Sequence, residues 1–297
     1  MKLAGLMVAL AVCASCAEKP APKVDAERAM QYTREIVAFG TRPLGSPGHK
    51  KVEEYLLTQL NKAGAQVEED AFIAQTPAGP LPVRNILAKF PGTREGVIVV
   101  ASHYDTNYGF PKDYVGANDG AATSGLLLEL ANQLRNPKGK ARAGYSVWLF
   151  FTDGEEAIKQ WTNEDSLYGT RHLAAKWLKD GTMKKVKAFL LLDMIGDADL
   201  NIERDHNSTD WLEELVGQAA KNLGYQSYFY GRDTAVDDDH KPFVKAGVPS
   251  ADLIDFDYGY NNVFWHTPQD TLDKLSVKSL RVAGDTVLET IRLLEQR

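Results

Sequence analysis

Apolar residues along the chain follow two patterns, one of short continuous runs and one that recurs every three to four positions. Short runs bounded by turn-forming residues are typical of buried strands, whereas the longer period is typical of amphipathic helices. The first pattern predicts strands at 66–72, 84–90, 97–102, 145–152, 186–193, 225–230 and 250–254. The second predicts helices at 25–39, 47–63, 118–134, 166–179, 210–223, 242–246 and 276–296.

Strands and helices therefore alternate over most of the chain, which predicts an α/β fold. We expect a central, mixed but mostly parallel, twisted sheet with helices on both faces. A chain of 297 residues with 44% hydrophobic residues can bury a large core. Internal repeats and changes of composition are absent from the sequence after the first segment, so a single domain is expected over 25–297.

The N-terminal segment departs from this alternation. A lysine is followed by the apolar run 3–12 and then by small residues and two cysteines. This pattern predicts a secretory signal at 1–16, too short to span a bilayer. Cys16 resembles a bacterial lipoprotein processing site, although Cys13 stands where such sites usually carry Leu, which leaves cleavage before Cys13 or simple secretion open. With a polar tether at 17–24, we expect a periplasmic lipoprotein of the cell envelope.

The charge balance excludes one class of partner. The chain has 34 basic and 40 acidic residues, a net charge of -6, and its sequence contains no Lys/Arg-rich stripe with interleaved aromatics. Nucleic acid is therefore not an expected partner. Contact with a membrane is expected only through a lipid anchor at Cys16.

Acidic and histidine side chains follow several predicted strands at the point where each strand ends. An isolated Glu pair is usually a solvated turn, and a lone His is more often packed than metal-bound. In an open α/β sheet, however, the carboxyl ends of the strands meet at the ligand crevice. Taken together, these side chains predict a metal site at that edge. They are His103, Glu155, Glu156, Asp193 and, in a later loop, the cluster 237–240, with Asp119 at a predicted helix start and His266 in the block FWHTPQD as two further candidates.

Six blocks of the sequence resemble those of the zinc-dependent aminopeptidase superfamily, which also contains the animal-type glutaminyl-peptide cyclotransferases. The resemblance spans nearly all of the chain after the signal. In order, the blocks read HYDTN, VGANDGAATSG, DGEEA, SLYGTRHLA, LLDMIGD and WHTPQD.

This resemblance implies a metal site of one of two kinds. In the cyclotransferase branch, one zinc ion is held by the matches of Asp119, Glu156 and His266. In the aminopeptidase branch, a second zinc ion uses the matches of His103 and Asp193, and the match of Asp119 bridges the two ions. The residue that matches Glu155 is the general base. All these ligand types are present here, so they do not separate the branches.

Residues between the ligands favour the cyclotransferase branch. The insertion AIKQWTNEDS with Trp161, the Trp265 that precedes His266, and the block with Asp238 are all similar to that branch. For the two tryptophans, core packing is the alternative to a pocket wall. One position departs from the animal pattern, because Asp252 stands where those enzymes carry His.

The expected activity is cyclisation of an N-terminal glutamine of peptides or proteins to pyroglutamate, with release of ammonia. One Zn²⁺ would polarise the amide, Glu155 would move the proton, and Asp193 and Asp238 would orient the leaving nitrogen. Trp161 and Trp265 would enclose the substrate. The alternatives are a dizinc aminopeptidase and, from another class, a catalytically silent binding module.

Overall fold

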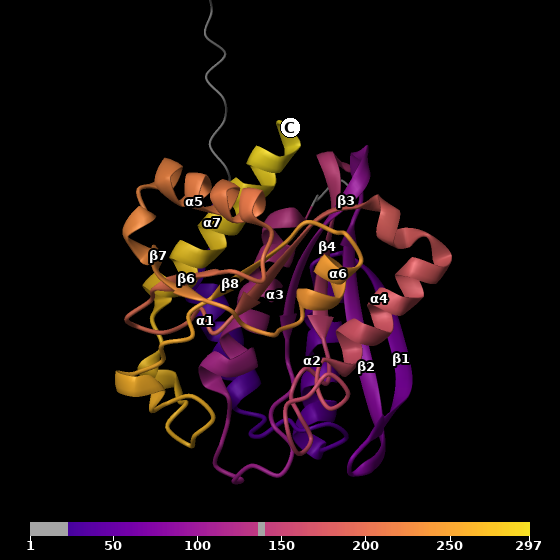
Figure 1. The fold of residues 1–297 in the computed structure, drawn as a ribbon, viewed down its shortest axis with the longest axis vertical. Helices are drawn as coiled ribbons and strands as arrows, with labels where there is room; N and C mark the ends of the chain where they lie inside the picture. Colours follow the sequence, from indigo (N-terminus) through magenta and orange to yellow (C-terminus); the bar gives the residue numbers. More distant parts are fainter. Residues whose placement is uncertain (1–22, 136–139) are drawn as a thin grey trace, which may run out of the picture.

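A six-stranded sheet in the order β1-β2-β4-β3-β5-β8 forms the centre of the computed structural model, which describes residues 23–135 and 140–297 (Figure 1). Pairing is antiparallel from β1 through β2 to β4 and parallel from β4 to β8. The strands are β1 (Gln66–Thr76), β2 (Gly79–Phe90), β3 (Gly92–His103), β4 (Arg142–Thr152), β5 (Val186–Asp193) and β8 (Ser250–Ile254). A separate parallel pair consists of β6 (Ile202–Asp205) and β7 (Phe229–Thr234).

Helices cover both faces of the sheet, so the expected fold class is confirmed (Figure 1). One layer contains α1 (Ala26–Val37), α2 (Pro47–Lys62), α3 (Thr123–Leu134), α5 (Asp210–Leu223) and α7 (Val277–Glu295). The smaller layer contains α4 (Tyr168–Asp180) and α6 (Lys241–Lys245). Short helical turns are η1 (Ala117–Ala122), η2 (Thr182–Lys185), η3 (Gln226–Tyr228), η4 (Tyr260–Asn262) and η5 (Leu272–Lys274).

The central strands are apolar without interruption because both of their faces are buried. Along β3, Ile98 and Val100 pack into the larger helical layer, whereas Val97, Val99 and Ala101 pack into the smaller one. Side chains alternate between the faces of a strand, so only a continuous apolar run can fill both layers.

Two regions differ from the sequence-based expectation. The Pro/Gly-rich stretch between the predicted strands 66–72 and 84–90 is itself strand apart from a turn at 77–78. Its prolines are tolerated because β4 pairs with β2 only over 86–90, which leaves one side of 79–85 without a ladder. The strand expected at 225–230 begins as η3 and becomes β7 only at Phe229, and its partner β6 was not expected.

The carboxyl ends of β3, β4, β5 and β8 meet at one edge of the sheet. Here His103 is in register with Thr152, and Asp193 with Ile254. The predicted signal and most of the tether lie outside the described residues. Within the described residues, no helix is long and apolar enough to cross a membrane.

Candidate active site

A cavity of about 570 Å³ lies at this edge of the sheet, and we call it the main pocket. The carboxyl ends of β5 and β8 and segments that follow β3, β4 and β7 line it, together with the loop before η5. Carboxylates lie at its floor, and aromatic side chains form much of its wall. Its lining includes Asn107, Tyr108, Phe110, Asp119, Glu155, Glu156, Trp161, Asp193, Asp237, Asp238, Trp265 and His266.

Three of the predicted ligands converge at one side of the pocket. His266 Nε2 lies 3.3 Å from Asp119 Oδ2 and 3.4 Å from Glu156 Oε1. A single ring nitrogen thus faces both carboxylates, as expected of ligands around one ion. Glu156 Oε1 is buried and has no hydrogen-bond partner among the described residues. A His and two carboxylates are a donor set that zinc accepts, so these residues fit the metal that the resemblance implies.

A second group shares Asp119 with the first. His103 Nε2 lies 3.1 Å from Asp119 Oδ1 and 3.3 Å from Asp193 Oδ1. Both nitrogens of His103 and Oδ1 of Asp193 are buried without hydrogen-bond partners in the described part of the chain. The two oxygens of Asp119 therefore face different groups, which is the placement required of a bridging ligand. All five residues named for the dizinc alternative are brought together.

Asp119 owes its position to a local break in η1. Asp119 has φ -82° and ψ 93°, and Gly120 follows with φ 87°. A Cβ at residue 120 would lie 3.0 Å from the ring of His103, so the close approach requires glycine. Asp270 accepts hydrogen bonds from the backbone N–H of Asp119 at 3.1 Å, and the Tyr114 hydroxyl donates to Asp119 at 2.8 Å. Asp119 is thus fixed before any ion binds.

The two glutamates of the loop after β4 are placed differently in the pocket. The Asp105 carboxylate accepts hydrogen bonds from the backbone N–H of Glu155 at 3.2 Å and of Glu156 at 3.3 Å. Asn107 donates to Glu156 Oε2, which leaves Oε1 for the His266 group. Glu155 faces the same pocket, outside both ligand groups.

Burial dominates the electrostatics of the pocket floor. Burial and the neighbouring Glu156 carboxylate raise the pKa of Glu155 well above its ordinary value. Burial and the Asp193 carboxylate raise the pKa of Asp238 in the same direction. For Glu156, burial and Asp119 raise the pKa to about 7. A cation between Asp119 and Glu156 would offset this repulsion.

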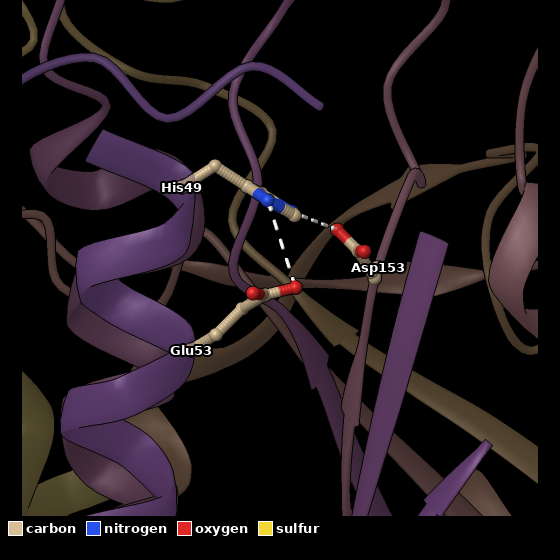
Figure 2. A group of neighbouring side chains, drawn as sticks. All are labelled: His49, Glu53 and Asp153. Atoms are coloured by element: carbon tan, nitrogen blue, oxygen red, sulfur yellow. Dashed lines mark hydrogen bonds and ion pairs between the residues drawn. The ribbon is translucent and has the colours of Figure 1, made fainter. Parts of the chain in front are cut away.

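The cluster of His49, Glu53 and Asp153 supports the start of the loop after β4 and differs in arrangement from the ligand groups (Figure 2). His49 Nε2 and Asp153 Oδ1 are hydrogen-bonded at 2.6 Å, whereas Nδ1 faces Glu53 at 3.7 Å. The other Asp153 oxygen accepts from the backbone N–H of Arg84 at 2.6 Å. Each nitrogen faces a different carboxylate, unlike the single nitrogen of the ligand groups. We interpret this cluster as a hydrogen-bonded support.

Asp252, the position that departs from the animal pattern, is fully buried near another histidine. His240 Nδ1 lies 3.7 Å from Asp252 Oδ2, and Nε2 lies 3.1 Å from Asp205 Oδ2. Again the two nitrogens face different carboxylates. Burial and the Asp238 carboxylate raise the pKa of Asp252 well above its ordinary value. An imidazole thus lies beside position 252 although the residue itself is acidic.

Both tryptophans singled out in the sequence line the main pocket and neither packs in the core. The Trp265 ring stacks on His266 with centroids 4.0 Å apart. Trp161 is 39% exposed and stands at the rim. Phe110 contacts His266 edge-on, with centroids 5.3 Å apart.

Several residues of the site were not anticipated. Tyr108 and Phe110 line the pocket, while Tyr114 and Asp270 hold Asp119. Asp270 closes the block WHTPQD, so its place in that block was the available signal. The aromatic residues lie in a loop without periodicity, which gives no such indication.

Comparison with known proteins agrees with this geometry. Residues 85–291 of the chain match peptidase family M28. A glutaminyl-peptide cyclotransferase-like protein of Bos taurus is 36% identical over 256 residues, which cover 77% of this chain and 66% of the bovine protein. The chain thus spans just under two thirds of that relative.

Solved structures resemble nearly the whole chain. A glutaminyl cyclase from an Acidobacteriales bacterium is 50% identical with a TM-score of 0.91, covering 97% of this chain and 100% of that one. A Zn-dependent exopeptidase from Parabacteroides distasonis is 26% identical with a TM-score of 0.79, covering 93% of this chain and 100% of that one.

Proposed function

The chain belongs to peptidase family M28, and we propose that it cyclises the N-terminal glutamine of peptides or proteins to pyroglutamate. The observation that carries this proposal is the main pocket itself. It combines one ligand group, a buried glutamate outside that group, and two tryptophans on the wall. Similarity to glutaminyl cyclases over the full length supports it.

We propose that one zinc ion is held by Asp119, Glu156 and His266. When bound, the ion would supply a Lewis acid that polarises the side-chain amide of the substrate. Asn107 and Tyr114 hold the two carboxylates through hydrogen bonds. Such outer contacts orient ligands, which matters for a site open to substrate on one side.

Glu155 would transfer the one proton that cyclisation requires. The substrate α-nitrogen bonds to the side-chain amide carbon, the bond from that carbon to the amide nitrogen breaks, and ammonia leaves. The proton lost by the α-nitrogen passes through Glu155 to the departing nitrogen, so the reaction balances without water. The raised pKa of the Glu155 carboxyl lies closer to the pKa of the substrate amine. Similar pKa values favour reversible transfer of a proton between the two groups.

Asp193 and Asp238 would orient the leaving nitrogen. Both line the pocket, and their carboxylates interact electrostatically. Trp161 and Trp265 would enclose the glutamine side chain and exclude water, which would otherwise compete as a nucleophile. The reacting groups already belong to one residue, so holding the ring-closing conformer accounts for much of the task.

A dizinc aminopeptidase is the second candidate, and the intact His103, Asp119 and Asp193 group favours it. In that case water would attack the first peptide bond. The two candidates predict different products from the same peptides. A peptide that begins with Gln would lose only ammonia to a cyclase, whereas a peptide that begins with Leu would be shortened by an aminopeptidase.

The test incubates purified, zinc-loaded protein with both peptides and follows their masses. Conversion of the Gln peptide without shortening supports cyclisation. Cleavage of the Leu peptide with the Gln peptide unchanged would refute it in favour of the peptidase. Zinc content per chain provides an independent measurement, since one ion accompanies the first outcome and two accompany the second.

We also propose that the protein is a lipoprotein of the cell envelope, anchored at Cys16 after cleavage of the signal immediately before that cysteine and tethered by 17–24. The support is the sequence pattern alone. Metabolic labelling with a palmitate analogue tests this proposal. Label should appear in the parent and disappear in Cys16→Ala, and label retained by that variant would contradict it.

A further inference from the structure

A second hollow of about 360 Å³ adjoins the main pocket. Trp161 and Asp237 line both cavities, so these two residues form their common rim. Residues 162–171 and α6 form the rest of the hollow. We call it the basic hollow and define it by Trp161, Thr162, Asn163, Ser166, Leu167, Arg171, Asp237, Lys241, Pro242 and Lys245.

The two cavities differ in charge. Three cationic side chains, Arg171, Lys241 and Lys245, line the basic hollow with one carboxylate, that of Asp237. The floor of the main pocket instead carries several carboxylates, and the whole chain has a net charge of -6. A local excess of positive charge next to the pocket therefore favours a negatively charged group there.

One of the three cations is free to bind such a group. The Arg171 guanidinium donates to the backbone carbonyls of Ser166 at 2.9 Å and Glu164 at 3.0 Å. Lys241 is paired with Asp237. Lys245 has no ion pair within the described residues and is exposed. Its ammonium group is therefore available to a carboxylate in the basic hollow.

The route of a bound peptide leads towards this rim. The glutamine head must reach Glu155 and the ligand group at the buried floor, so the following residues leave through the mouth. An extended chain advances about 3.3–3.6 Å per residue, so the backbone of the second and third residues lies about 3–7 Å further out than that of the glutamine. Trp161, Lys159 and Asp237 are exposed at the mouth. Beyond Trp161 and Asp237 the chain meets the basic hollow.

From this geometry we propose that the basic hollow is a subsite for a carboxylate on the second or third residue of the substrate. The inference rests on the proposed function and deepens it, because it names acidic Gln-initiated peptides as the favoured substrate class. The same chemistry is offered by an Asp or Glu side chain and by the C-terminus of a tripeptide. Both sources enter the test.

The experiment measures kcat/KM for four peptides: Gln-Glu-Ala-amide, Gln-Ala-Ala-amide, Gln-Lys-Ala-amide and Gln-Ala-Ala with a free carboxyl end. An exposed ion pair changes binding modestly, so the Glu peptide should exceed the Lys peptide roughly two- to fivefold at low salt. A preference for free over amidated Gln-Ala-Ala identifies the C-terminus as the source. Sodium chloride should reduce both ratios.

The decisive comparison is between the parent and the variant Lys245→Glu. Reversal of this charge should invert the ratio of kcat/KM for the Glu peptide to kcat/KM for the Lys peptide. Loss of folded enzyme does not change this ratio, because both peptides are measured on one preparation. Lys221→Glu, an exposed lysine of α5, is the matched control and should keep the parent ratio. An unchanged ratio in Lys245→Glu, or a parent that prefers the Lys peptide, would overturn the proposal. Cyclisation of Gln-Ala-Ala-amide tests the proposed function separately.

Discussion

Glu155→Gln is the substitution that isolates the proton transfer from metal binding. Glutamine has the size of glutamate and keeps the backbone N–H that donates to Asp105 at 3.2 Å, so the loop should keep its conformation. Positioned acid–base groups contribute about 10² to 10⁴ in rate. At 1.36 kcal/mol per tenfold, this corresponds to about 2.7–5.4 kcal/mol of transition-state stabilisation. Glu155 is only 7% exposed, so bulk water replaces it poorly, and we expect the upper half of that range.

The assay follows ammonia release from a Gln peptide, with zinc measured in the same samples. The variant should retain the zinc content of the parent, because Glu155 belongs to neither ligand group. Its kcat should fall by 10³ or more, while KM changes little. A kcat within tenfold of the parent would refute the role of Glu155. Loss of zinc together with activity would show that Glu155 serves the metal instead.

Three further predictions concern the metal, the support cluster and the pH dependence of stability. Chelation should abolish activity, and zinc should restore it in the parent but not in His266→Ala, as measured by ammonia release. His49→Ala should lower the free energy of unfolding by about 1–3 kcal/mol in a denaturant titration, because it leaves the buried Oδ1 of Asp153 without the hydrogen bond to His49. Burial raises the pKa of Asp255 to about 8. Its folded pKa exceeds the unfolded value, so stability should decline from pH 4 towards pH 8, and Asp255→Asn should flatten that decline in Tm.

Each of these predictions has a contradicting outcome. Activity that survives chelation would remove the metal from the account. His172→Ala is the control for His49, because the partner of His172, Asp70, keeps bonds from Asn85 and Lys176. An equal loss of stability in both variants would argue against a special role of the support cluster. A Tm of Asp255→Asn that falls as steeply as that of the parent would assign the pH dependence to other groups.

Part of the site could be predicted from sequence because the fold presents four of its residues at or just after strand ends, whereas Asp119 lies in η1 and His266 in the loop before η5. His103 and Asp193 directly end β3 and β5, and Glu155 and Glu156 follow β4 within a few residues. Parallel strands bring such ends to one edge whatever their separation in sequence. The alternation of strands and helices was enough to predict this arrangement.

Contacts that depend on distant packing could not be predicted in the same way. His49 and Asp153 are 104 residues apart, and neither has a local signal of the bond between them. Strand β6 reads IERD and is held by its pairing with β7, so its composition did not indicate a strand. The prolines of β2 suggested a loop, because the open side of that strand is visible only in the sheet.

The central claim is that the main pocket closes a ring on an N-terminal glutamine and does not hydrolyse a peptide bond. Mass spectrometry of a Gln-initiated peptide incubated with the zinc-loaded protein, with ammonia quantified in parallel, tests this most directly. We predict one ammonia released per peptide and a product of full length that lacks a free α-amine. A shortened product with free glutamine in solution would contradict the account.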